Sequence, residues 1–359
     1  MVLDFATGYW VQVKVLVTGA SGFIGAWVCK TLLEKGYHVV GTVRSPAKGA
    51  YLERLFEKDG LGKDHFSFVI VDDIEKEGAF DQAVVGVDAV EHTASPVTLS
   101  HAGDPQEIIQ PAVRGTIGIL ESIKKHAPGV KRVVITSSYA AVITPKAPLP
   151  GQEFGTIDES DWNILSANEV EQKGQSAGGV HIYRASKVLA ERAAWDFVEK
   201  NKASIGFDLV TVLPPMVYGP GIHEVTTSPG TSLDVFRDNV LLASKTEEEL
   251  LAPVNVSGYW ADVRDVAAVH VLSLASPRAG GERFLTASGP DSWQNFLDAI
   301  HTSQRDVTDV PKGYPGKGHN PKVPARVIAT KAENLLNFKF RTVEDTIPAT
   351  FRYIREKGF

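Results

Sequence analysis

The chain has 359 residues, 43% of them hydrophobic and 22% charged, a composition typical of a globular protein rather than a disordered one. Its formal net charge of −6, with no long run of Lys or Arg, argues against a nucleic-acid partner. The N-terminal residues lack the basic flank and apolar run of a signal peptide, and no apolar run approaches the ~18 residues needed to cross a bilayer. We therefore expect a cytoplasmic protein that has neither a membrane nor a nucleic-acid partner.

Short β-rich runs alternate with helical stretches from Val13 onward, the pattern of parallel βαβ units. Strands are expected near residues 13–18, 37–43, 66–71, 89–93, 132–136 and 207–213. Long helices are expected near residues 23–35, 105–126 and 182–200. Six strands joined by crossovers predict an α/β fold with a doubly wound parallel sheet.

Regular structure is interrupted after Leu213, where several Pro and Gly residues predict loops and short helices over residues 215–258. A helix is expected after Asp262, a strand near residues 283–287 and another helix from Asp291. The segment from Thr342 to Asp345 has the pattern of a helix cap and predicts a final helix.

A glycine-rich turn follows the first expected strand, where Thr18-Gly19-Ala20-Ser21-Gly22-Phe23-Ile24-Gly25 leads into a helix. Glycines allow a tight turn and close backbone approach, so that amides at the helix start can hold a pyrophosphate. The spacing differs from the commonest fingerprint, and a plain glycine-rich turn is the alternative. We predict a dinucleotide-binding domain over residues 12–214, completed by elements at approximately 262–287. Residues 215–359 would then form mainly a smaller substrate-binding lobe.

Arg44 follows the second expected strand, and Lys48 lies one helical turn later. An acidic side chain at this place would bind a ribose 2′-hydroxyl, whereas a guanidinium suits a 2′-phosphate. The pair therefore predicts NADPH over NADH. The alternative for each is a solvated surface charge.

Tyr183 and Lys187 lie four residues apart at the start of a helix, and therefore on one face. A free tyrosine has a pKa of about 10, and a nearby fixed cation lowers that value. The pair predicts a proton donor for reduction and a base for oxidation. A surface Tyr and Lys would be the alternative, but the helix precedes the sixth strand of a sheet that already carries a dinucleotide turn.

The fifth expected strand ends in Thr136-Ser137-Ser138-Tyr139. Ligands bind beyond the carboxyl ends of such strands, so a serine there can donate to a substrate oxygen. The alternative, expected for one of the two serines, is a hydroxyl that satisfies the strand end.

Together these motifs resemble the extended short-chain dehydrogenase/reductases, whose fold is of the Rossmann type. The resemblance extends from about Val13 to the C-terminus, and it is greatest to fungal aldehyde and ketone reductases, including methylglyoxal/isovaleraldehyde reductases, and less to plant dihydroflavonol reductases. The segments that carry it are TGASGFIG at 18–25, VDDI at 71–74, HTASP at 92–96, ITSSYAAV at 135–142, YRASK at 183–187, PPMVYGP at 214–220, WADVRDVA at 260–267 and FKFRTVEDT at 338–346.

The resemblance implies that Ser138 is the catalytic hydroxyl, that Tyr183 supplies the proton and that Lys187 also bonds the nicotinamide ribose. It places Ser137 beside the cofactor. The other contacts that it implies are Asp73 and Ile74 around the adenine, Thr93, Ala94 and Ser95 along the cofactor, and the backbone of Pro214 and Val217 at the nicotinamide end. Ala112 stands where many relatives carry a catalytic asparagine, and His181-Ile182-Tyr183 replaces the signature of cinnamoyl-thioester reductases.

We therefore expect NADPH-dependent reduction of aldehydes or ketones to alcohols. A nucleotide-sugar epimerase is one alternative, although epimerases resemble NAD users with an acidic residue at the place of Arg44. A non-catalytic dinucleotide sensor is the other.

Apolar residues flanking the motifs favour a bulky hydrophobic carbonyl substrate over a sugar nucleotide, with core packing as the alternative. These residues are Pro96, Val97, Tyr139, Met216, Val217 and Tyr218. Asp262, Arg264 and Asp265 are expected to form structural salt bridges. No metal site is predicted. The protein is expected to be a monomer or a homodimer, since related proteins often pair through the two helices that follow strands four and five.

Overall fold

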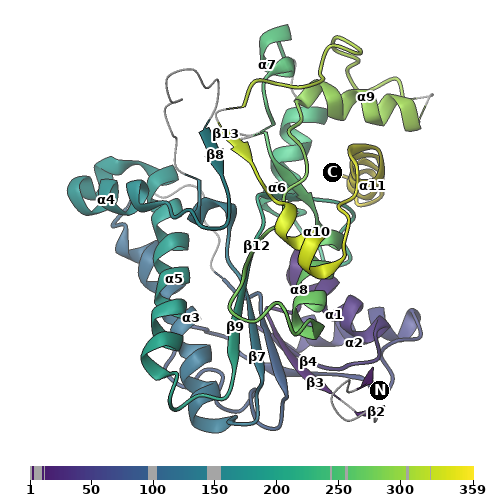
Figure 1. Cartoon of the computed structure of the whole chain (residues 1–359). Helices are drawn as coiled ribbons and strands as arrows, with labels where there is room; N and C mark the ends of the chain where they lie inside the picture. The colour runs from purple at the N-terminus through teal and green to yellow at the C-terminus, as the bar shows by residue number, and fades with distance from the viewer. Residues whose placement is uncertain are drawn as a thin grey trace. The chain divides into compact units, whose positions relative to one another are not determined.

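The computed structural model describes residues 2–3, 10–11, 13–95, 103–143, 155–242, 245–254, 258–304, 307–323 and 325–359 (Figure 1). The chain forms two compact units. The first contains Met1–Thr144, Asp161–Leu213 and Ala267–Phe284, and the second contains Pro145–Ser160, Pro214–Val266 and Leu285–Phe359.

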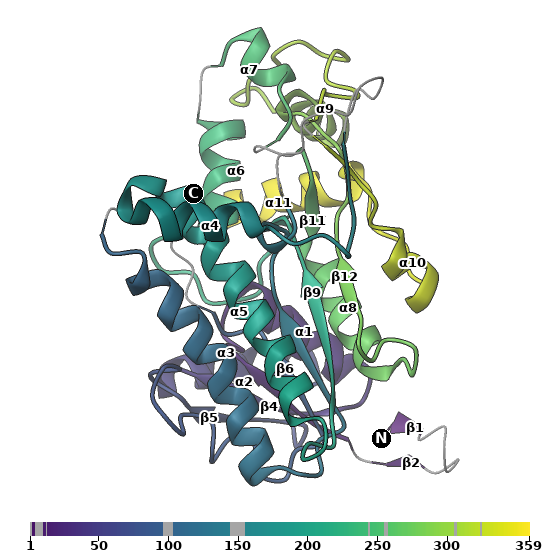
Figure 2. The ribbon, with the colours of Figure 1, turned by 60° about the vertical axis from the view of Figure 1, so that its left-hand side comes forward.

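The first unit is built on a seven-stranded sheet in the order β12-β9-β7-β6-β3-β4-β5 (Figure 2). Its strands are β3 (Lys14–Thr18), β4 (His38–Val43), β5 (Phe66–Ile70), β6 (Ala89–His92), β7 (Arg132–Thr136), β9 (Asp208–Leu213) and β12 (Arg283–Leu285). Every neighbouring pair from β5 to β9 is parallel. The chain runs outward from β3 to β5 and then returns to β6 on the other side of β3. This reversal of direction confirms the predicted doubly wound sheet.

Helices cover both faces of this sheet. They are α1 (Phe23–Glu34), α2 (Pro46–Lys58), α3 (Gln106–His126), α5 (Gly179–Asn201) and α8 (Val263–Ala275), while α4 (Ile164–Lys173) packs against α5. Figure 1 shows α3 and α5 side by side on one face, and α1 and α2 on the other. Strand residues such as Leu16 and Val133 have no exposed surface and pack with Ile119 and Ile123 of α3. Burial on both faces explains the nearly continuous apolar strands.

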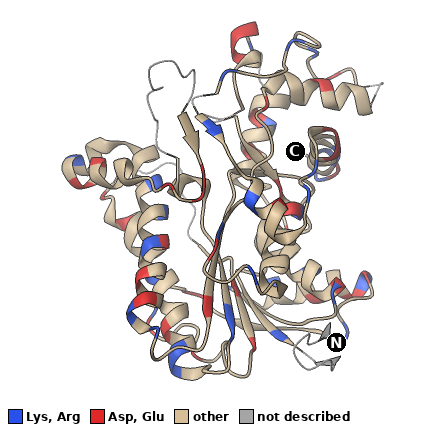
Figure 3. Cartoon of the chain, in the orientation of Figure 1, with Lys and Arg blue, Asp and Glu red and all other residues tan. Residues whose placement is uncertain are grey.

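Acidic and basic residues are mixed along α3 and α5 (Figure 3). Neither helix therefore presents a face of one sign to a polyanion. Within the part of the chain that the structure describes, no helix combines the length and the apolar character that crossing a membrane requires.

The second unit contains short elements. They are β8 (Gly155–Ile157), β10 (Met216–Tyr218), α6 (Thr231–Phe236), a π-helical turn (Arg237–Leu241), α7 (Glu247–Leu251), β11 (Trp260–Asp262), α9 (Trp293–Ser303), β13 (Ala325–Val327), α10 (Thr330–Leu336) and α11 (Val343–Glu356). β10 pairs with β11 and β8 with β13, both in parallel. These small sheets were not predicted. Near the N-terminus, β1 (Val2–Leu3) pairs with β2 (Trp10–Val11).

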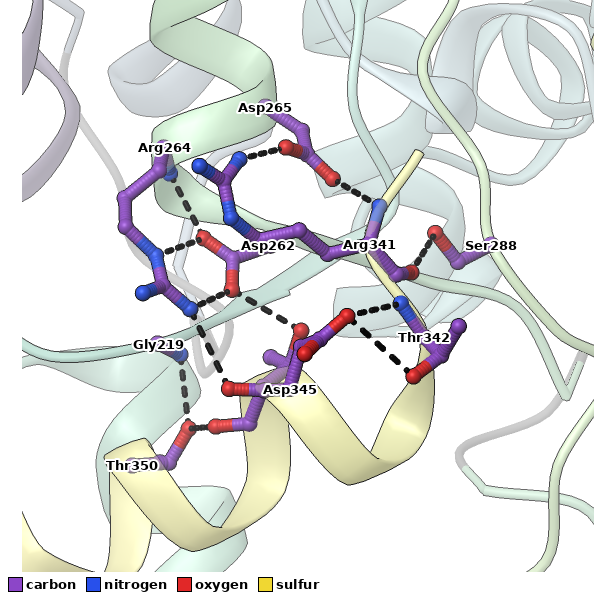
Figure 4. A network of polar contacts seen from close by, with 10 residues as sticks. Gly219, Asp262, Arg264, Asp265, Ser288, Arg341, Thr342, Asp345 and Thr350 are labelled. Carbon is purple, nitrogen blue, oxygen red and sulfur yellow. Dashed lines mark hydrogen bonds and ion pairs between the residues drawn. The ribbon is translucent and has the colours of Figure 1, made fainter. Parts of the chain in front are cut away.

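A polar network joins β11 to the C-terminal helix α11 within the second unit (Figure 4). The fully buried carboxylate of Asp262 accepts bonds from Arg264 Nε at 2.9 Å and Nη2 at 2.6 Å, and from Thr346 Oγ1 at 2.8 Å. Asp265 accepts the backbone N–H of Arg341 at 2.7 Å and also pairs with its guanidinium. The predicted structural salt bridges are therefore confirmed.

The same network holds the turn after β10. The N–H of Gly219 donates to Thr350 Oγ1 of α11 at 2.8 Å. Gly219 has a φ of +117°, and a Cβ there would lie 2.9 Å from Val263 Cγ1, so both backbone and space require glycine. At the start of α11, Thr342 and Asp345 form the predicted capping box.

Candidate active site

A cavity of about 260 Å³ lies at the carboxyl ends of β3, β4 and β6. It is lined by Gly19, Ser21, Gly22, Thr42, Val43, Arg44, Lys48, Val71, Ile74, Thr93, Ala94 and Ser95. Its strands flank the point where the sheet order reverses, the place at which doubly wound sheets bind ligands. Three separate sequence motifs thus meet in one cavity.

The glycine turn has a shape that only glycine permits. Gly19 has a φ of +66°, and a Cβ there would lie 2.9 Å from the Cα of Ala94. A Cβ on Gly25 would clash with the carbonyl oxygen of Gly19, so this glycine lets α1 pack against the turn. Gly22 is the N-cap of α1 and offers no side chain to cap it. A helix start whose N-cap residue makes no side-chain cap bond suits pyrophosphate oxygens.

Two cations stand at the other end of this cavity. Arg44 is exposed at the end of β4, and Lys48 is half-buried in the first turns of α2. Among the described lining residues there is no carboxylate. This charge arrangement fits a 2′-phosphate and offers nothing to a free ribose hydroxyl.

Not every predicted cofactor contact reaches the cavity. Ile74 lines it, but Asp73 is exposed outside the lining, and its carboxylate accepts the N–H of Glu75 at 2.9 Å. Phe23 and Ile24 lie in the first turn of α1, outside the lining residues. The contacts of Asp73, Phe23 and Ile24 with the cofactor therefore stay predictions.

Ser138, Tyr183 and Lys187 come together at the carboxyl end of β7. Ser138 is the N-cap of the 3-10 helix Tyr139–Ala141, and its Oγ accepts the N–H of Ala140 at 3.1 Å. The phenol of Tyr183 is hydrogen-bonded to Ser138. Lys187 Nζ lies 5.5 Å from the centroid of the Tyr183 ring. Because Ser138 Oγ already accepts one hydrogen bond, its proton is left to donate toward an oxygen in front of Tyr183.

Burial governs the ionisation of this group. It raises the pKa of Tyr183, an effect that the hydrogen bond with Ser138 partly offsets. Burial also lowers the pKa of Lys187 to about 8. The ammonium of Lys187 donates to Ser95 Oγ at 2.7 Å and faces the ring of Tyr183. The Tyr183 pKa is therefore raised, whereas a lowered value was predicted, because desolvation of the phenol is the largest effect on it.

Lys187→Met is expected to increase the free energy of unfolding at neutral pH. A folded-state pKa of about 8, below the ordinary 10.5, means that the native state binds this proton more weakly than the unfolded state. The resulting penalty is about 3 kcal/mol at pH 7, and it decreases as the pH rises from about 8 toward 10.5. Denaturant melts at pH 7 and pH 10 should therefore show a stabilisation that shrinks at pH 10. An equal difference at both pH values would contradict a charged, desolvated Lys187.

Ser137, predicted to lie beside the cofactor, is hydrogen-bonded to a buried carboxylate. Its Oγ donates to Glu191 Oε2 at 2.6 Å, and Ser137 is not among the residues that line the cavity. Glu191 is fully buried and pairs with Arg283. Neither Glu191 nor Arg283 was predicted from the sequence. For Glu191 a signal existed, because it follows Lys187 by one helical turn on the same face of α5.

The residues of the predicted apolar pocket differ in their burial. Tyr218 has no exposed surface, and its ring centroid lies 5.8 Å from that of Phe236 and 5.5 Å from that of Phe296. Tyr218 therefore belongs to the core of the second unit. Tyr139, Pro214 and Val217 are buried, and Met216 is half-buried. Pro96 and Val97 lie outside the described residues.

A doubly wound sheet with a glycine turn at its reversal point and a Tyr–Lys helix before its sixth strand defines a dinucleotide-binding α/β protein. The sequence matches the NAD dependent epimerase/dehydratase family over residues 15–286, and the chain belongs to that family.

Individual relatives cover most of the chain. The ketoreductase azaE of Aspergillus niger is 39% identical over 301 residues, which are 82% of this chain and 84% of the relative. A putative NADPH-dependent methylglyoxal reductase of Candida albicans, GRP2, is 39% identical over 344 residues, 93% of this chain and 97% of the relative. The crystal structure of Gre2 from Candida albicans in complex with NADPH superposes with a TM-score of 0.85 at 33% identity, covering 97% of this chain and 100% of that chain. The resemblance to extended short-chain reductases is thus confirmed.

Proposed function

We propose that this protein is an NADPH-dependent carbonyl reductase that converts aldehydes or ketones to alcohols. The observation that carries the proposal is the presence of two features along one sheet edge. One is a cavity with a glycine turn and two cations, and the other is the group formed by Ser138, Tyr183 and, near the Tyr183 ring, the ammonium of Lys187. The names of the relatives, a ketoreductase and an NADPH-dependent methylglyoxal reductase, support the same activity.

The residues of this chain divide the work of binding. NADPH, when bound, supplies the hydride. The turn from Gly19 to Gly22 and the start of α1 would hold its pyrophosphate, and Arg44 and Lys48 its 2′-phosphate.

The catalytic group handles the carbonyl oxygen. Ser138 donates a hydrogen bond to that oxygen and polarises the carbonyl. Tyr183 gives it a proton, and its raised pKa keeps the phenol protonated at neutral pH. Lys187 stabilises the phenolate that remains, because its ammonium lies near the ring. Ala112 is buried on α3 and has no polar side-chain atom, so no relay runs through a side chain at that position.

The activity test follows the loss of NADPH absorbance with dicarbonyls, aliphatic aldehydes and aryl ketones. We expect consumption of NADPH matched by formation of one alcohol per NADPH oxidised. A nucleotide-sugar epimerase would behave differently, because it restores its cofactor in each cycle. Conversion of a sugar nucleotide without net NADPH consumption, followed by NMR of the product, would therefore contradict the proposal. Failure of every carbonyl compound would favour a non-catalytic sensor.

The same assay tests the cofactor. We expect at least a tenfold preference for NADPH over NADH, because a charge-assisted hydrogen bond contributes about 1.5–3 kcal/mol and ~1.4 kcal/mol is tenfold. Arg44→Asp should weaken NADPH binding in a fluorescence titration. Arg54→Asp is the matched control, since Arg54 is exposed on the neighbouring helix α2 but does not line the cavity. Equal affinity of the wild-type protein for the two cofactors would refute the assignment of Arg44.

A further inference from the structure

A buried polar cluster centred on Glu191 lies directly behind the catalytic group. Glu191 is on α5, one turn after Lys187, and its carboxylate has no exposed surface. It accepts hydrogen bonds from four side chains of the first unit. These donors are Ser137 after β7, Thr211 in β9, Trp195 in α5 and Arg283 in β12.

The geometry of the cluster fixes the direction of each bond. Arg283 donates to both carboxylate oxygens, from Nε to Oε1 at 2.8 Å and from Nη2 to Oε2 at 3.2 Å. Thr211 Oγ1 reaches Oε1 at 2.8 Å, and Ser137 Oγ reaches Oε2 at 2.6 Å. A guanidinium can only donate, so both carboxylate oxygens of Glu191 act as acceptors. The hydroxyl of Ser137 must therefore donate its hydrogen bond to Glu191, and this bond holds the hydroxyl in one orientation.

Arg283 is itself held in place. Its guanidinium carbon lies 3.7 Å from the centroid of the Trp162 ring, and Nη1 donates to the carbonyl oxygen of Asp161 at 2.8 Å. Stacking and bidentate pairing restrict the planar guanidinium in every direction. The guanidinium that pairs with Glu191 is thus held in one position.

The residue before Ser137 is anchored by a second buried carboxylate. Thr136 Oγ1 lies 2.9 Å from His270 Nε2, and His270 Nδ1 lies 2.7 Å from Glu91 Oε2. Both side chains of the His270–Glu91 pair are fully buried. Successive residues of a strand point to opposite faces, so Thr136 and Ser137 are held from the two faces of the sheet. The next residue is Ser138.

We propose that Glu191 is a positioning residue for carbonyl reduction, which acts through Ser137 to fix Ser138 relative to Tyr183. Glu191 shares α5 with Tyr183 and Lys187, and its bond to Ser137 ties the end of β7 to that helix. The hydrogen-bond donor and the acid are thereby held in one rigid arrangement. Replacing a buried ion pair by apolar residues is often neutral or stabilising, so stability alone gives little reason for this cluster. The inference rests on the proposed function.

The test removes one bond without unpairing a charge. Glu191→Gln would leave the cation of Arg283 buried without its counter-charge, so Ser137→Ala is the sharper variant. We expect Ser137→Ala to lower kcat by about 10-fold or more, since a misplacement of about 1 Å can cost about 100-fold. KM and the dissociation constant for NADPH should stay within about twofold. Thr211→Val is the matched control, because it removes a hydroxyl bound to the same carboxylate but not adjacent to a catalytic residue.

The outcomes separate three explanations. A loss of kcat with Ser137→Ala but not with Thr211→Val, at similar decreases in Tm, supports positioning. Equal losses of kcat in both variants would reduce the cluster to a stability element and overturn the inference. Weaker NADPH binding with normal kcat in Ser137→Ala would overturn it by placing Ser137 at the cofactor. If the wild-type protein reduces no carbonyl compound, the proposed function itself is wrong. If the wild-type protein is active and Ser137→Ala is unaffected, only the positioning role of Glu191 is wrong.

Discussion

Tyr183→Phe is expected to lower the turnover number of carbonyl reduction by about 100- to 10,000-fold, the usual contribution of general acid catalysis. The substitution keeps the ring and its contact with Lys187 but removes the proton that the carbonyl oxygen must receive. NADPH affinity, measured by fluorescence titration, should change by less than about twofold. Tyr37→Phe provides the control, because it removes another buried phenol of the first unit, before β4.

The pH profile gives this prediction a second readout. Tyr183 must be protonated to act, and burial places its pKa above the ordinary value of 10.0, so the phenol itself limits reduction only at strongly alkaline pH. Lys187, with a pKa of about 8, loses its charge first and with it the stabilisation of the phenolate. Reduction by the wild-type protein should therefore slow above about pH 8. Near-normal turnover of the Tyr183→Phe variant would show that another group is the acid.

The sequence predicted the parts of the fold that depend on local pattern. Apolar runs predicted six strands of the large sheet, β3, β4, β5, β6, β7 and β9, within one residue at each end, because strands buried on both faces carry continuous hydrophobic side chains. β10 and β8 were missed, since each has three residues in a stretch rich in Pro or Gly. Such short strands form only when a distant segment pairs with them, and their partners here are β11 and β13.

The candidate site shows the same division. Gly19 and the Tyr183–Lys187 pair could be found because turn chemistry and helical spacing operate within a few residues. The partner of Ser137 could not be found in this way. It depends on Glu191, 54 residues away, and on Arg283, which is 92 residues beyond Glu191. Ser137 and Ser138 are adjacent residues of the same type, so the sequence alone does not distinguish their roles. Only the tertiary hydrogen bond of Ser137 to Glu191 distinguishes them.

That distinction is tested most directly at Ser138. Ser138→Ala is expected to lower turnover by about 100-fold or more, the scale for loss of one donor to a developing oxyanion. This loss of turnover should exceed that of Ser137→Ala, because the hydroxyl of Ser138 is hydrogen-bonded to Tyr183, whereas the hydroxyl of Ser137 donates to Glu191. The loss of activity that follows deprotonation of Tyr183 at strongly alkaline pH should also move to higher pH, because the hydrogen bond from Ser138 lowers the pKa of the phenol.

Ser138→Thr serves as the control for this variant, because alanine also removes the acceptor of the Ala140 N–H whereas threonine keeps both the acceptor and the donor. Steady-state kinetics of the three variants, with NADPH affinity measured alongside, decide between the serines. If Ser137→Ala were the more damaging change to turnover at unaltered cofactor affinity, the catalytic hydroxyl would belong to Ser137.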